Sequence, residues 1–425
     1  MKMNISWAFA GNAVYAACQW MVFVLLVRSL TLADVGQFAY WMAVTGPVFV
    51  LANVRLRNLV ATDVESPHPF ADYLRARLLT TTFAVCTTLL IGLGLSASLD
   101  SLVIVALLVA ARACDAISDI CHGLFQRELD MQSAAIGLLA NGILSVAFVG
   151  VSVALWPSLA VAAGSYAAGS VVTLVAWDLP RMRTVTQTRH GATASRPSRL
   201  AVWRLIRRAL PLGLSAAVGS LQTNLPRYIV AAYLGHAALA VFTALAYIPT
   251  LGNLIVNAVA QASLPVLARD LRTSSLAAYR QRLRRLVQAG VGLAAISVLA
   301  TIVVGRPIVA AIYGAEVAQI DVLLGLMVAA AVSYTYVFLG TAATARLRFG
   351  SQLLISSAGL FIVAVSVIPL VSRFGLVGGG YALCAGALVE GGAYVALTLH
   401  DLRSDGQLPF MAPGLTGVGG PVTHG

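Results

Sequence analysis

One apolar segment of this chain, beginning at residue 101, carries its polar side chains on a single helical face. At 100° per residue, five of them fall within about 80° of one another. A guanidinium on such a face could bind an anion through bidentate hydrogen bonds, and a carboxylate could bind a proton or a cation. The five residues are Arg112, Asp115, Asp119, His122 and Gln126.

The elements that position these residues are expected to be membrane-spanning helices. Charged residues make up 10% of the chain and hydrophobic residues 59%, against roughly 25% charged in an average soluble domain. Apolar runs of about 20 residues, the length that crosses a bilayer, recur throughout. The sequence predicts an all-α polytopic membrane protein of twelve spans, at about 5–27, 35–60, 78–97, 101–124, 133–155, 158–177, 211–233, 238–264, 288–312, 320–344, 352–371 and 376–399.

The membrane setting limits what the polar face can do. A charge at the bilayer centre costs about 2.5–3.5 kcal/mol on insertion scales, so this face must turn toward protein or a water-filled cavity. Two interpretations stay open. Either Arg112 and Asp115 neutralise each other and only fasten helices together, or the face lines a path on which Asp115 or Asp119 binds a coupling proton or cation.

Three further spans carry polar faces, and the last span holds a carboxylate, Glu390, beside two glycines. Singly, such side chains could join helices at about 0.6 kcal/mol each. Four polar faces together predict a shared hydrated lumen. The further faces comprise Asn12, Tyr15 and Gln19; Ser220, Asn224 and Arg227; and Thr243, Tyr247, Thr250, Asn253, Asn257 and Gln261.

The distribution of arginine predicts the orientation. Of the 28 cationic residues, 27 are Arg, and cationic loops resist translocation. With the N-terminus inside, 23 cations, Arg75 and Arg77 among them, lie on the cytoplasmic side, against Arg28, Arg306 and Arg373 outside. Both termini are therefore expected to be cytoplasmic. Cationic loops that lie beside anionic lipid account for the net charge of +12, so we expect no nucleic-acid partner.

Two halves of the chain are similar to each other. Asn53 and Asn257 lie 204 positions apart, and Tyr73 and Tyr279 lie 206 apart, each pair in matching surroundings. Parallel repeats of six spans are common in secondary transporters, which rock one half against the other. The expected divisions are an N-terminal six-helix bundle at 1–180, a cytoplasmic linker at 181–203, a C-terminal six-helix bundle at 204–403 and a disordered tail at 404–425.

Several motifs that would indicate an enzyme are absent from the sequence. The only Lys is Lys2, so the chain has no P-loop and no internal Lys for a pyridoxal Schiff base. It has no His-Glu-x-x-His motif, and its five cysteines lie in apolar spans without metal-ligand spacing. We therefore expect no cofactor, no metal and no catalysis. A membrane glycan polymerase or acyltransferase is disfavoured because the outer loops are short.

Several loose motifs resemble Wzx-like polysaccharide flippases of the MOP superfamily, to which MATE transporters also belong. The resemblance extends to about residue 315. It rests on Gly11-Asn12-Ala13-Val14-Tyr15, Gln19-Trp20, Asp34-Val35-Gly36-Gln37-Phe38, Leu51-Ala52-Asn53-Val54-Arg55-Leu56-Arg57, Gly123-Leu124-Phe125-Gln126-Arg127 and Asn224-Leu225-Pro226-Arg227-Tyr228. It implies two six-helix bundles in a V, a central cationic cavity, and transfer of an undecaprenyl-pyrophosphate-linked oligosaccharide to the periplasmic leaflet of the bacterial inner membrane.

The resemblance and the polar faces together give the candidate site. Arginine suits a pyrophosphate, amides suit sugar hydroxyls, and an inside-negative potential favours outward movement of an anion. Polysaccharide polymerase and chain-length machinery are possible partners, besides membrane lipids. The alternative function is that of a cation-coupled MATE-type multidrug exporter. Expected substrate ligands are Arg112, Arg227, Arg55, Arg57, Asn12, Gln19, Asn224, Asn253 and Asn257, and expected ion-coupling residues are Asp115, Asp119 and Glu390.

Overall fold

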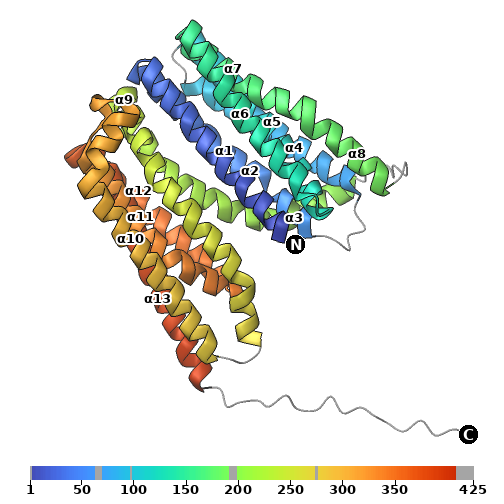
Figure 1. The fold of residues 1–425 in the computed structure, drawn as a ribbon, viewed down its shortest axis with the longest axis vertical. Coiled ribbons are helices and arrows are strands. Elements are labelled where there is room, and N and C mark those ends of the chain that lie inside the picture. Colours follow the sequence, from blue (N-terminus) through green and yellow to red (C-terminus); the bar gives the residue numbers. More distant parts are fainter. Residues whose placement is uncertain (1, 63–68, 96–97, 191–198, 273–275, 408–425) are drawn as a thin grey trace, which may run out of the picture.

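The protein is a bundle of long helices arranged as two arms of a V (Figure 1). A computed structural model describes residues 2–62, 69–95, 98–190, 199–272 and 276–407, and every regular element in these ranges is a helix. The first bundle contains α1 (Lys2–Ser29), α2 (Leu32–Asn53), α3 (Leu56–Thr62), α4 (Phe70–Leu95), α5 (Leu99–Arg127), α6 (Met131–Leu155), α7 (Leu159–Thr173), the π-helix η1 (Leu174–Asp178) and α8 (Leu179–His190).

The second bundle begins with an unusually long element, α9 (Arg199–Arg272). Its backbone leaves the helical region at Gly235, where φ is 83° and ψ is 175°. Glycine adopts this conformation without a Cβ clash, so α9 is two spans joined by a sharp turn. It is followed by α10 (Leu276–Tyr313), the short 3-10 helix η2 (Ala315–Val317), α11 (Ile320–Ala345), α12 (Phe349–Phe374) and α13 (Leu376–Gln407).

Eleven of the described helices are long and apolar enough to cross a membrane, and α9 supplies two spans. The prediction of twelve spans in two six-helix bundles is therefore confirmed, and the protein is a multi-pass membrane protein. The repeat also has a structural counterpart, because Tyr73 and Tyr279 are both fully buried near the starts of α4 and α10.

The two bundles meet at one end of the molecule, which we call the closed end. It contains Arg28, Gly36, His236 and Tyr313. The Arg28 Nε atom donates to the carbonyl of Ile312 at 2.7 Å, and the Trp20 Nε1 atom donates to the Tyr313 hydroxyl at 2.6 Å. A Cβ atom on Gly36 would overlap the backbone carbonyl of His236. Helices α2 and α9 therefore touch backbone to backbone here.

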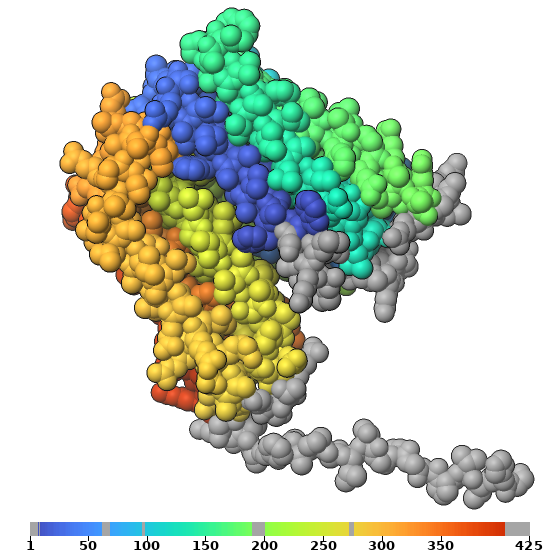
Figure 2. All heavy atoms as spheres, in the orientation of Figure 1, coloured from blue at the N-terminus to red at the C-terminus, as the bar shows by residue number. Residues whose placement is uncertain are grey.

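The other end, which we call the open end, carries the N-terminus and the last turn of α13. In Figures 1 and 2 the blue-to-green helices and the yellow-to-red helices are in contact at the upper left and diverge from there. The first half of α9 stays beside the first bundle: near its start Val202, Leu205 and Ala209 pack among buried residues of α3, α4 and α5, and further along the Tyr228 hydroxyl donates to the Ala43 carbonyl of α2 at 2.6 Å.

The domain boundaries stay a prediction. Within the expected linker, 181–203, helix α8 continues to His190 and α9 begins at Arg199. The residues between, 191–198, lie outside the described part of the chain. Of the expected tail, 404–425, α13 includes residues up to Gln407, and residues 408–425 also lie outside it.

Helix caps fix where the polar face of α5 begins and where its neighbour α6 starts. The Ser98 side chain accepts from the backbone N–H of Ser101 at 3.3 Å and caps α5. Asp130 accepts from the Ser133 N–H at 3.1 Å and caps α6. Such caps satisfy backbone donors that would otherwise lack partners. Together they position the side chains of α5 against those of α6.

Candidate functional site

Arg112 lies halfway along α5, roughly 20 Å by helix rise from either end of that helix. Its neighbours in electrostatic range are Asp115, Tyr15, Tyr166 and Tyr247. One terminal nitrogen contacts the Met42 Sδ atom at 3.7 Å, while the Nε atom is buried with no hydrogen-bond partner. Arg112 is thus a charge at mid-membrane depth with unused donor capacity.

Arg227 lies in the first half of α9 and faces the same region from the second bundle. Asn224, one turn earlier, accepts from its Nη1 atom at 2.9 Å and donates to the Ser220 carbonyl at 2.8 Å. The Arg227 Nε atom is also buried without a hydrogen-bond partner. Tyr247 lies within electrostatic range of both Arg227 and Arg112. The tyrosine is therefore a neighbour of an arginine from each bundle.

A second hydrogen bond orders the first-bundle side of this region. The Tyr166 hydroxyl donates to the Gln19 Oε1 atom at 3.0 Å, and the Gln19 Nε2 atom is buried without a partner. We refer to Arg112, Arg227, Tyr15, Tyr166, Tyr247, Gln19 and Asn224 as the central cluster. Buried polar atoms in proteins normally have partners. The free donors of Arg112, Arg227 and Gln19 therefore point to a ligand.

Arg112 and Asp115 do not form an ion pair, so the interpretation in which they only neutralise each other does not describe this structure. Asp115 instead accepts from the Asn141 Nδ2 atom of α6 at 2.9 Å, and its second oxygen has no hydrogen-bond partner. Asp115 remains a carboxylate without a direct cation.

Asp119 is held by two arginines. Arg57 lies 3.4 Å and Arg77 2.8 Å from its carboxylate oxygens, and Arg77 also donates to Asn53. Arg77 precedes the span predicted at 78–97, but α4 already begins at Phe70, so Arg77 is part of that helix and its side chain is fully buried. Since Asp119 is occupied in this way, its use as a cation site would require both contacts to break.

Replacing Arg77 is expected to destabilise the protein strongly. Removing Arg77 takes away a charge-assisted hydrogen bond worth about 1.5–3 kcal/mol and leaves Asp119 with the longer contact to Arg57 alone. We expect Arg77→Ala to lower the free energy of unfolding in detergent by that amount. Arg75→Ala, at an exposed position on the same helix, should change it little. Equal stability of the two variants would contradict the assigned role.

Glu390 is buried inside the second bundle, apart from the central cluster. It is 5% exposed, accepts from the Tyr336 hydroxyl and lies close to Gln222. Gly359 leaves room for it, because a Cβ there would overlap the Glu390 carboxylate. The described ion pairs include none with Glu390.

The remaining predicted residues lie outside the central cluster. Arg55 is exposed at the open end, after α2, and Arg57 is half-buried beside Asp119. Asn12 is exposed on α1, one turn before Tyr15. Asn253 is half-buried, and Asn257 is exposed and donates to the Asn253 carbonyl at 2.8 Å. They form a discontinuous set of polar groups from the open end toward the cluster.

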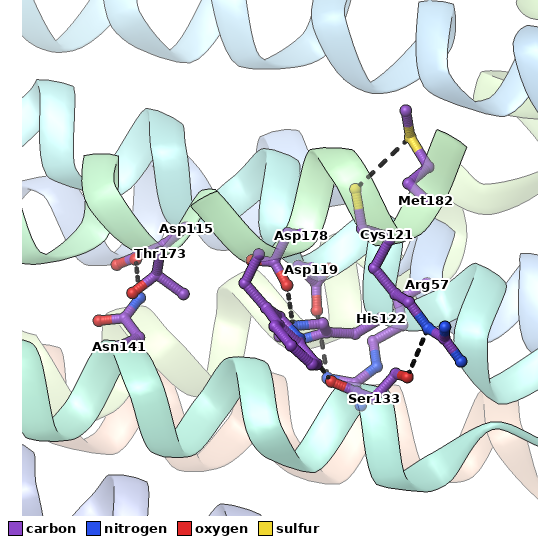
Figure 3. A network of polar contacts seen from close by, with 12 residues as sticks. Arg57, Asp115, Asp119, Cys121, His122, Ser133, Asn141, Thr173, Asp178 and Met182 are labelled. Carbon is purple, nitrogen blue, oxygen red and sulfur yellow. Dashed lines mark hydrogen bonds and ion pairs between the residues drawn. The ribbon is translucent and has the colours of Figure 1, made fainter. Parts of the chain in front are cut away.

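Sequence reasoning missed Tyr166, Arg77 and Asp178 as site residues. Asp178 lies just beyond the predicted end of its span, where an acidic residue is unremarkable. In the structure it is fully buried against His122 (Figure 3). Asp178 is followed by Leu179-Pro180-Arg181, so the sequence around it carries no signal that it would be buried.

Comparison with known proteins identifies the class of protein first. The chain matches the inward-facing structure of a multidrug resistance MATE family transporter of the MOP superfamily with a TM-score of 0.75, at 14% identity, over 94% of this chain and 99% of that one. The outward-facing structure of a multidrug resistance MATE family transporter of the same superfamily matches with a TM-score of 0.66, at 16% identity, over 95% of this chain and 96% of that one. A MOP superfamily transporter from Pyrococcus furiosus matches with a TM-score of 0.64, at 16% identity, over 95% of each chain. The fold is that of a MOP transporter.

The family follows from the sequence comparison. Residues 1–270 match the family model described as polysaccharide biosynthesis protein, which covers more than half of the chain. The chain belongs to this family. It is also 22% identical over 382 residues to the capsular polysaccharide biosynthesis protein CapF of Staphylococcus aureus, covering 89% of this chain and 94% of that protein.

Proposed function

We propose that the protein moves an undecaprenyl-pyrophosphate-linked oligosaccharide from the cytoplasmic to the periplasmic leaflet of a bacterial inner membrane by alternating access. The observation that carries this proposal is the pair Arg112 and Arg227. They approach from opposite bundles and keep buried donors without partners. Membership of a polysaccharide biosynthesis family and the transporter fold support it.

The chemistry of the cluster suits a pyrophosphate. Guanidinium groups donate forked, charge-assisted hydrogen bonds to phosphate oxygens, and Gln19 adds an amide donor. The substrate would span both bundles, because Arg112 belongs to α5 and Arg227 to α9. Closing the open end around it would pull the bundles together, and separating the closed end would release it.

The open end is assigned to the cytoplasm in this proposal. Arg55 and Arg57 lie there, at the junction of α2 and α3, and would meet the anionic headgroup first. Asn253 and Asn257 on α9 would then contact sugar hydroxyls, with Asn12 on α1. An inside-negative potential favours outward movement of the anion by about 2.3 kcal/mol per charge per 100 mV. Association with polymerase and chain-length machinery belongs to the same proposal.

One observation favours the alternative, a cation-coupled drug exporter. Asp115 and Glu390 are carboxylates without a direct cation partner, and such groups could bind a cationic drug or a coupling ion. Two half-buried arginines at the bundle interface would repel a cationic drug, so we rank this function second.

Loss of the gene is expected to abolish surface polysaccharide and to leave lipid-linked oligosaccharide in the cytoplasmic leaflet. The two functions separate in the same strain, because loss of an exporter would raise drug sensitivity while surface polysaccharide stays normal. Extraction and leaflet labelling of the lipid-linked pool, together with a drug-sensitivity panel, measure both. Normal surface polymer with raised drug sensitivity would favour the exporter.

A further inference from the structure

A buried histidine and aspartate in the first bundle form a site that the central cluster does not use. The His122 Nε2 atom of α5 lies 3.1 Å from the Asp178 Oδ1 atom, and their side chains are 5% and 0% exposed. Figure 3 shows the two side chains facing each other, between Asp115 on one side and Cys121 on the other. Asp178 is the last residue of the π-helix η1.

The surroundings are shaped to hold this pair. A Cβ on Gly137 of α6 would lie 2.7 Å from both bonded atoms, so only glycine leaves them room. Trp177 lies beside the same point and donates from Nε1 to the Ser133 carbonyl at 3.1 Å. The Asp178 Oδ2 atom is buried and has no hydrogen-bond partner. A carboxylate that served only to join helices would be expected to have both oxygens satisfied.

Most charges around the pair are already neutralised. Asp119 is bound by Arg57 and Arg77, and Asp130 by Arg181 at 2.7 Å. Partial burial would raise the pKa of Asp130, but hydrogen bonds from Ser133 and Arg181 hold it below its ordinary value. Two titratable groups that face the pair have no cation of their own: the Asp115 carboxylate and the Cys121 thiol, which contacts the Met182 Sδ atom at 3.7 Å.

The ligand that fits this site is a proton. A metal ion needs several ligands, and the described residues contain no group of three or more His, Cys, Asp or Glu side chains that could hold one. A deprotonated pair would bury one net negative charge, whereas a protonated pair is neutral overall. We propose that His122 and Asp178 bind one proton, taken up and released during each transport cycle. The second half of this proposal rests on the proposed function.

The π-helix supplies a way to release the proton. A π segment contains one residue more than the α-helical register would hold, and such segments recur at functional sites. Conversion of η1 to α-helix would rotate Asp178 by about 100° and withdraw its carboxylate from His122. The pair would then separate, and the lone histidine would lose its proton to water.

Asp115 connects the pair to the central cluster. It lies within electrostatic range of Asp178 on one side and of Arg112 on the other. An anion bound to Arg112 changes the field at Asp115 and so the proton affinity of the pair. By linkage, a proton on the pair changes anion binding by the same factor.

Trp177 makes the proton observable in the purified full-length chain. A protonated imidazole quenches a nearby indole, so the emission of wild type minus that of Trp177→Phe reports on His122. We expect this difference to change with pH as the imidazole gains or loses its proton. His122→Gln should abolish the titration, and His236→Gln, a histidine at the closed end, should leave it unchanged.

Asp178→Asn keeps the size of the side chain and covers the case in which His122→Gln does not fold. Because it removes the carboxylate that stabilises the protonated imidazole, it should weaken proton binding and alter the pH dependence of the emission difference. A wild-type emission difference that does not change with pH would overturn the proton site. An unchanged pH dependence of the emission difference in His122→Gln or in Asp178→Asn would also overturn it.

The transport half is tested separately in proteoliposomes with undecaprenyl-pyrophosphate-linked oligosaccharide as the probe. An imposed pH gradient should change the translocation rate of wild type and not that of Asp178→Asn. Equal responses would overturn coupling through this pair. If the wild type moved no lipid-linked oligosaccharide while the Trp177 titration held, the proposed function would fail and the proton site would stand.

Discussion

Replacing Arg112 or Arg227 by alanine is expected to abolish surface polysaccharide in a complementation assay while the protein stays in the membrane. Each arginine offers charge-assisted hydrogen bonds worth about 1.5–3 kcal/mol, and losing them weakens anion binding roughly 10- to 100-fold. The double variant should be inactive, since the substrate would lose its contacts with both bundles.

Lysine variants at positions 112 and 227 separate the effect of the positive charge from that of the guanidinium geometry. Lysine at either position keeps the charge without the planar fork, so it should restore activity only in part. Arg204→Ala is the control, because Arg204 is exposed and its Nε atom bonds within α9 to the Leu200 carbonyl. Normal polymer from both alanine variants, at normal protein level, would refute the role of the cluster.

Any side chain at Gly36 is expected to prevent the closed end from forming. A Cβ there would meet the backbone of His236, which cannot move aside as a flexible side chain could. Gly36→Val should therefore separate α2 from the Gly235 turn and stop the transport cycle. The hydrogen bonds of Trp20 and Arg28 to the end of α10 should be lost with it.

Labelling at Val317 measures this separation. Val317 is 1% exposed at the closed end, so a Val317→Cys reporter in a chain whose native cysteines are replaced by Ser should react slowly with a membrane-impermeant maleimide. Gly36→Val should raise the rate about tenfold or more, a shift of about 1.4 kcal/mol. Gly94→Val is the control, because a Cβ there meets nothing within 4 Å. Equal labelling in the two backgrounds would contradict the packing at Gly36.

The sequence predicts the fold well because a long apolar segment in a membrane must satisfy its backbone hydrogen bonds internally, and an α-helix does so within one segment. Its polar faces also predict that Arg112, Arg227 and Gln19 meet, since each must avoid lipid. The structure adds that Tyr247, already on a predicted polar face, lies within electrostatic range of both arginines, which no spacing in one segment could reveal.

Three features could not be predicted from local patterns. Arg77 looks like a loop residue because polar residues precede it, and its partner Asp119 is 42 positions away. Asp178 looks like a span boundary because the π segment that carries it inward has no sequence signature. The contact of Gly36 with His236 depends on how two bundles meet. Each feature is a long-range pairing of side chain or backbone that local hydrophobicity does not encode.

Leaflet exchange in proteoliposomes tests the central claim most directly. The purified protein would be reconstituted with undecaprenyl-pyrophosphate-linked oligosaccharide that carries a fluorophore on the sugar, and a membrane-impermeant quencher would report the accessible fraction. The account predicts rapid exchange with wild type and none above protein-free vesicles with the Arg112→Ala, Arg227→Ala double variant. Exchange by the double variant at the wild-type rate, or no exchange by folded wild type, would contradict it.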